Sequence, residues 1–137
     1  MDRKLVGLML LFFLAFGVFT TVVVFNQPLT QLTRAKEETV ASASESLIFA
    51  WPLTVKADGK TSSIISVFIR NLNGKPLSNK AVVLTSTLGN LSEASVTTDN
   101  QGKATFQLTS LTPGVAQITA TVSGEATLTQ KVTVSFQ

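Results

Sequence analysis

The stretch "TTDNQGKATFQLTS", residues 97–110, predicts a tight turn that leads into a β-strand. The carboxylate of Asp99 can accept hydrogen bonds from backbone N–H groups two or three residues further on, and Gly102 can adopt a positive φ. Beyond the turn, apolar residues alternate with polar ones over residues 104–108, which is typical of a strand with one buried face. The stretch therefore indicates a β domain whose turns face water.

Runs of the same kind fill the chain from Trp51 to the C-terminus, each bounded by Gly, Pro, Asn or Asp. Asp58-Gly59 separates two alternating runs and predicts a hairpin between them. About seven short strands at this spacing are typical of an antiparallel β-sandwich. Alternation assigns the following residues to its core: Ile65, Val67, Ile69, Val82, Leu84, Ala104, Phe106, Leu108, Ile118, Ala120, Val122, Val132, Val134 and Phe136.

Three stretches carry a resemblance to a known family. The stretch "ISVFIRNLNGKPLSNKAVVL" contains an "NGxP" turn, "TTDNQGKATFQLTS" has the form "TTDxxGxAxxxLTS", and "PGVAQITATVSG" is followed by "VTVSF". In this combination, residues 53–137 resemble the bacterial immunoglobulin-like domains of the invasin and intimin adhesin type (group 1). The resemblance implies an all-β, immunoglobulin-like fold and a role in adhesion, spacing or assembly with cell-envelope partners.

The N-terminal part of the chain has a different composition. From Leu5 to Phe25 there are 21 residues without a charge, and a helix of this length spans roughly 31 Å, close to the hydrocarbon thickness of a bilayer. A buried core helix is seldom apolar on every side over such a length. A cleaved signal peptide is disfavoured because the small-x-small sequence at residues 41–43 lies far beyond Phe25. We therefore predict a transmembrane helix with the limits Leu5 and Phe25.

Orientation follows from the charges before this helix and from the nature of the β domain. Arg3 and Lys4 precede the predicted span, and the β part resembles a cell-surface module, so the N-terminus is expected in the cytoplasm. After the span, a short amphipathic helix is expected to begin near Pro28, with a flexible stalk as the alternative. The predicted organisation is a cytoplasmic N-terminus (1–4), a transmembrane helix (5–25), a juxtamembrane helix or linker (26–50) and the sandwich domain (51–137).

The composition excludes several classes of function. The chain has no His, Cys or Tyr, which removes imidazole acid–base catalysis, thiolate nucleophiles and the usual zinc ligands. The seven Lys and Arg residues from residue 51 onward are scattered singly, without the clustering of a nucleic-acid interface. The four acids of this region, Asp58, Glu93, Asp99 and Glu125, are too dispersed for the oxygen ligands that Ca²⁺ prefers. We expect no enzymatic activity, no metal or other cofactor, no nucleic acid and no small-molecule substrate.

Together these features predict a single-pass, membrane-anchored protein that carries one immunoglobulin-like module at the cell surface. Its expected partners are the lipid bilayer and other envelope or surface proteins, with copies of itself as a further option. Phe68 and Val83 fall on outward-facing strand positions, and Arg70 lies two residues beyond Phe68. These three residues are the candidate surface contacts.

A pilin-like filament subunit is the alternative interpretation. The order of apolar helix, amphipathic extension and β domain resembles type IV pilin-like subunits, with the helix in the filament core and the β domain on its surface. Gly7 resembles their processing site, but the Glu that is typical of the fifth mature position is absent: counting from Leu8, that place is Phe12. N-terminal sequencing separates the two interpretations, since Met1 fits an anchor and Leu8 fits a processed subunit.

Overall fold

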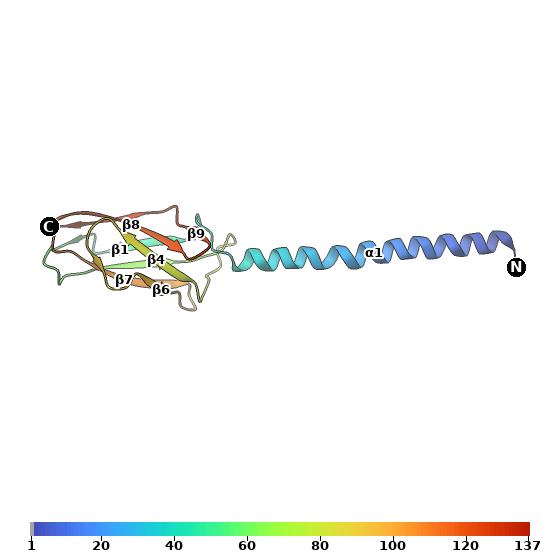
Figure 1. Cartoon of the computed structure of the whole chain (residues 1–137), viewed down its shortest axis with the longest axis horizontal. Coiled ribbons are helices and arrows are strands. Elements are labelled where there is room, and N and C mark those ends of the chain that lie inside the picture. The colour runs from blue at the N-terminus through green and yellow to red at the C-terminus, as the bar shows by residue number, and fades with distance from the viewer. Residues whose placement is uncertain (1) are drawn as a thin grey trace. The chain divides into compact units, whose positions relative to one another are not determined.

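The computed structural model describes the backbone of residues 2–137 and the side chains of residues 2–23 and 39–137. The chain divides into two compact units, Met1–Lys36 and Glu37–Gln137. Figure 1 shows the N-terminal part as one helix, α1 (Arg3–Thr39), and the C-terminal part as paired strands. The backbone of α1 covers both the predicted transmembrane segment and the first part of the predicted linker. Phe25, Pro28 and the predicted amphipathic face lie outside the described side chains.

The first part of α1 is long and apolar enough to cross a membrane. Among the described residues, this segment is Arg3–Val23, 21 residues with a mean hydropathy of 2.5, and it includes Leu5. The hydroxyl groups of Thr20 and Thr21 donate hydrogen bonds to backbone carbonyl oxygens one turn earlier, at 2.8 and 2.7 Å. Polar groups satisfied within the helix suit a lipid environment, which offers no hydrogen bonds of its own.

Two β-sheets form the C-terminal unit (Figure 1). Among the described residues, the first sheet has the strand order β1 (Leu47–Trp51), β3 (Ser63–Phe68), β7 (Lys103–Thr109), β5 (Asn90–Leu91). The second sheet has the order β2 (Thr54–Val55), β10 (Val132–Phe136), β8 (Gly114–Val122), β4 (Ala81–Ser86), β6 (Ser95–Thr97), with β9 (Ala126–Thr127) paired to β8. The pairs are antiparallel except for β2 with β10. The prediction of an immunoglobulin-like β-sandwich preceded by an apolar helix is confirmed.

The core lies between the two sheets and is built by strand alternation. Of the side chains predicted to be inward, all are buried except Val132, which is partly buried and packs against the others. The side chains of β3, β4, β7, β8 and β10 alternate between buried and more exposed positions, as a two-layer sandwich requires. Further core residues were not predicted from the sequence: Ala41, Ile48, Val55, Leu77, Ala116 and Leu128.

The sandwich begins earlier than the predicted limit at residue 51. Residues 47–51, "LIFAW", form β1 and pair antiparallel with β3, so the last part of the predicted linker is a strand. Ile48 is only 1% exposed and belongs to the core. The physical reason is the alternation of this short run, which puts Ile48 inward and its two neighbours outward.

Asp58-Gly59 does not join two strands of one hairpin, which corrects the sequence prediction. β2 pairs with β10 in the second sheet, whereas β3 pairs with β1 and β7 in the first, so the chain crosses between the sheets at this turn. The turn itself is real: Asp58 Oδ1 accepts hydrogen bonds from the N–H groups of Lys60 (2.8 Å) and Thr61 (2.7 Å). Turn chemistry is local, but the partner of each strand is chosen by packing across the whole domain.

Candidate interaction surface

The outer face of the first sheet carries a row of apolar side chains over β1 and β3. In the register of these strands, Trp51 lies opposite Ile64 and Leu47 lies opposite Phe68. Trp51 is 76% exposed, Phe49 49% and Ile64 45%. These side chains face away from the core because the residues between them on each strand are the inward ones. We call this set the apolar stripe: Leu47, Phe49, Trp51, Ile64 and Phe68.

Phe68 lies on the outer face, as the alternation predicts, but it is half-buried. Its ring packs edge-on against Phe49, with the ring centroids 6.1 Å apart and the planes at 71°. The ammonium group of Lys103 lies 5.9 Å from the centroid of the Phe68 ring. The more exposed part of this surface is on β1, most of which was predicted to be linker. The alternation of "LIFAW" is the sequence signal that indicates this strand.

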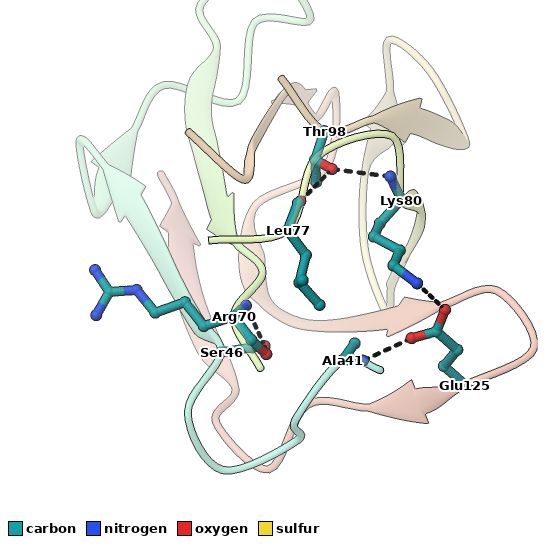
Figure 2. Close-up of polar contacts among 7 residues, drawn as sticks. All are labelled: Ala41, Ser46, Arg70, Leu77, Lys80, Thr98 and Glu125. Atoms are coloured by element: carbon teal, nitrogen blue, oxygen red, sulfur yellow. Dashed lines mark hydrogen bonds and ion pairs between the residues drawn. The ribbon is translucent and has the colours of Figure 1, made fainter. Parts of the chain in front are cut away.

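Arg70 is exposed just beyond the end of β3, and its backbone holds the segment that precedes β1. The Arg70 N–H donates to Ser46 Oγ at 3.1 Å, and the Arg70 carbonyl accepts from the N–H of Ser42 at 2.8 Å. Figure 2 shows the guanidinium group pointing away from the other drawn side chains. Arg70 is therefore fixed at its backbone and presents its charge to solvent.

Val83 lies on a different surface. It belongs to β4 in the second sheet, opposite Thr121 and Ser95 on the neighbouring strands, and it is half-buried. The outer faces of the two sheets lie on opposite sides of the sandwich, so Val83 and Phe68 cannot take part in one compact contact. Alternation alone indicates that a side chain points outward, but not which sheet its strand joins.

The Glu125 carboxylate, in the turn between β8 and β9, is hydrogen-bonded to the segment before β1. Glu125 Oε2 accepts a hydrogen bond from the Ala41 N–H at 2.6 Å, and Glu125 Oε1 pairs with the ammonium group of Lys80 (Figure 2). Partial burial acts to raise the pKa of the Glu125 carboxyl, but the hydrogen bonds from Lys80 and Ala41 and the charge of Lys80 together hold it below its ordinary value. The ionised form is therefore the one that this site stabilises.

Thr98 positions the backbone of Lys80. The Lys80 N–H donates to Thr98 Oγ1 at 2.9 Å, and the buried Thr98 hydroxyl donates to the carbonyl of Leu77 at 2.7 Å (Figure 2). Because both partners of the Thr98 hydroxyl are backbone groups, the loop before β4 has little freedom. Lys80 is thus held on the side of the domain where Glu125 lies.

The turn around Asp99 is occupied by backbone interactions. Asp99 Oδ1 accepts hydrogen bonds from the N–H groups of Gln101 (2.8 Å) and Lys103 (3.0 Å), and Gly102 has a φ of 72°. A Cβ atom on Gly102 would come within 2.5 Å of the Ile69 carbonyl oxygen, so the position requires glycine. Among the described residues, no group of three or more His, Cys, Asp or Glu side chains could hold a metal ion. The turn geometry predicted for Asp99 and Gly102 is confirmed.

Comparison with known proteins places this geometry in a family. Residues 50–137 match the bacterial Ig-like domain (group 1). The chain belongs to this family. Intimin from Escherichia coli O127:H6 is 40% identical to this Ig-like chain over 91 residues, which are 66% of the chain and 9% of intimin. The chain therefore spans only a small fraction of the length of this relative.

Solved structures support the same family assignment. Invasin, a bacterial integrin-binding protein, superposes with a TM-score of 0.66 at 34% identity, over 72% of this Ig-like chain and 20% of the invasin chain. A C-terminal intimin fragment in complex with the intimin-binding domain of the translocated intimin receptor superposes with a TM-score of 0.60 at 34% identity, over 72% of this chain and 33% of the fragment. Both relatives are characterised by binding other proteins. Neither supports the pilin-like alternative.

Proposed function

We propose that this chain is a single-pass membrane protein that presents its Ig-like module outside the membrane, where the module adheres to other envelope or surface proteins. The observation that carries the proposal is the presence, in one chain, of a sandwich of the intimin and invasin type and a helix apolar over 21 residues. The helix serves as the anchor, and the N-terminus with Arg3 stays in the cytoplasm.

The module acts by surface contact rather than by chemistry. The carboxylates of Asp58, Asp99 and Glu125 are all engaged in hydrogen bonds that hold turns or the segment before β1. The described side chains also form an exposed apolar surface, the apolar stripe, with the exposed Arg70 side chain near one end of it. Exposed aromatic and Arg side chains are the residue types that contribute most to protein–protein contacts.

Cysteine labelling tests the topology, because the chain has no native Cys. Two single-cysteine variants are compared in spheroplasts with a membrane-impermeant maleimide: Asp2→Cys before the helix and Thr105→Cys on β7. Thr105→Cys should react in intact spheroplasts, whereas Asp2→Cys should react only after lysis. Protection of Thr105→Cys in intact spheroplasts would contradict the proposed orientation.

Adherence is tested with cells that produce either the full chain or a version that ends after residue 46. Retention of the cells on a monolayer of partner cells under flow should fall when the sandwich is removed. Equal retention with and without the sandwich would overturn the adhesive role.

A further inference from the structure

The sheet face that carries the apolar stripe has few charged side chains. Among the outward-facing residues of β1, β3 and β7, all of them described, Lys103 is the one charged residue, and it lies at the end of the stripe over the Phe68 ring. The neighbouring side chains toward β7 are neutral hydroxyl and amide groups, from Ser66, Thr105 and Gln107. A second surface of the same kind can approach this face without burying like charges.

The size of the stripe suits a weak pairing rather than a stable dimer. Its exposed apolar side-chain area is on the order of 400 Å², since a whole aromatic side chain offers about 150–250 Å². With its polar flank, the face reaches the low end of specific interfaces, which bury less than about 600 Å² on each partner. Such an interface forms readily only when the partners are held close together. A shared membrane supplies that condition, because tethering raises the effective concentration.

The edge of β1 is a less suitable place for a partner than its face. β1 is an edge strand of the first sheet, but the Ile48 N–H that points away from β3 donates to Gln130 Oε1 at 3.3 Å. An incoming strand would have to displace this bond. The outer face, in contrast, presents Trp51 and Phe49 without such an obstacle.

The outer face of the second sheet offers less apolar surface. Its outward residues on β8 and β9 include Thr119, Thr121 and Thr127, and the hydroxyls of Thr121 and Thr127 lie 3.1 Å apart in a hydrogen bond with each other. Val115 is well exposed at one end of this face, and Val83 is half-buried. Hydroxyl groups of this kind are well hydrated, so the second sheet has the weaker drive to associate.

We propose that the apolar stripe is a self-association face, through which two membrane-held copies of this chain pair across a twofold axis. The pairing rests on the proposed function, because the membrane anchor brings the two faces together. Trp51 and Phe49 form the centre of the contact, and the neutral side chains of β7 form its rim. The pairing leaves the second sheet of each copy, with Val83, open to other partners.

Cross-linking of the full chain in phosphatidylcholine vesicles tests this pairing. Thr105→Cys reports on the first sheet and Thr133→Cys, at an exposed position of β10, reports on the second. A short bis-maleimide should give several-fold more covalent dimer with Thr105→Cys than with Thr133→Cys. Random collisions would cross-link the two positions equally, so the excess measures pairing through the first sheet. Adding Trp51→Lys should reduce this yield to the level of Thr133→Cys, since it places two like charges in the contact. Adding Val115→Lys, the matched change on the other face, should leave the yield unchanged.

Equal yields from the two faces, or a yield that Trp51→Lys does not change, would overturn the pairing. Phe49→Ser serves as a second variant if Trp51→Lys alters the thermal melt of the domain. The outcome separates from the adhesive role: cells that adhere normally, while Thr105→Cys in vesicles gives no more covalent dimer than Thr133→Cys, would overturn the pairing alone. Failure of the full chain to float with the vesicles would overturn the anchor and the pairing together.

Discussion

Glu125 accepts a 2.6 Å hydrogen bond from the backbone N–H of Ala41, 84 positions earlier in the chain. This bond joins the turn between β8 and β9 to the segment that precedes β1. The Thr129 N–H adds a second link of the same kind, donating to the Ala43 carbonyl at 3.1 Å. Because Ala41 is also buried at 6% exposure, residues 41–46 belong to the folded domain, although they precede the residues that match the family.

The Lys80–Glu125 pair should couple weakly but measurably. Both side chains are about one-fifth exposed, so solvent screens the pair and a double-mutant cycle with Lys80→Met and Glu125→Gln should give a coupling of about 0.2–1 kcal/mol in the free energy of unfolding. Hydrogen exchange at the Ala41 amide should also become faster in Glu125→Gln. Zero coupling together with unchanged protection of Ala41 would contradict the role assigned to this carboxylate.

Truncation should show that the domain needs its N-terminal strand. A fragment of residues 37–137 should be soluble and cooperative in urea unfolding. A fragment of residues 51–137 lacks all of β1 except Trp51 and should be much less stable. The loss follows from the uncovered core beside β3, where Ile48 alone contributes about 1.5–3 kcal/mol of burial. Equal urea midpoints for the two fragments would show that β1 is dispensable.

The contrast between Ile48 and Ile64 tests the two faces of the first sheet. Ile48→Ala removes a side chain that is 1% exposed and should lower the free energy of unfolding by about 2–5 kcal/mol. Ile64→Ala, the same change at a position 45% exposed on the adjacent strand, should cost less than about 1 kcal/mol. Urea unfolding of residues 37–137 measures both. A reversed order of the two effects would mean that the register of β1 is wrong.

Asp58 should make stability depend on pH in acid. The N–H of Thr61, then that of Lys60 and the Thr61 hydroxyl, lower the pKa of Asp58 from 3.8 to about 2. A depressed pKa gives a stabilising contribution that is present above pH 3.8 and is lost as the pH falls from there toward about 2. Asp58→Asn should therefore flatten the fall in the free energy of unfolding across this window. The same slope in both proteins would refute the assignment.

Calcium should leave the domain unchanged. The Asp99 carboxylate already accepts two backbone hydrogen bonds. Ca²⁺ requires about six to eight oxygen ligands, which several carboxylates and carbonyls must supply together. Thermal melts with excess EDTA and with millimolar Ca²⁺ should coincide. A large rise in Tm with Ca²⁺ would show that a site exists at this turn or elsewhere in the domain.

Strand alternation and turn chemistry in the sequence were sufficient to predict a two-layer β domain, its inward side chains and the turn at Asp99. These features depend on neighbours within a few residues, such as the two-residue period around Phe106. The uncharged run that begins at Leu5 likewise needed no tertiary information, because the length and polarity of a single helix decide whether it suits a bilayer.

The tertiary structure alone decided which strands share a sheet and which outward residues share a surface. Asp58-Gly59 shows the difference: the turn was predicted, but the strands on either side of it joined different sheets. Phe68 and Val83 were both predicted to face outward, yet they lie on opposite sides of the sandwich. The bond from Ala41 to Glu125 has no local signal, because it exists only after the packed core has brought two distant segments together.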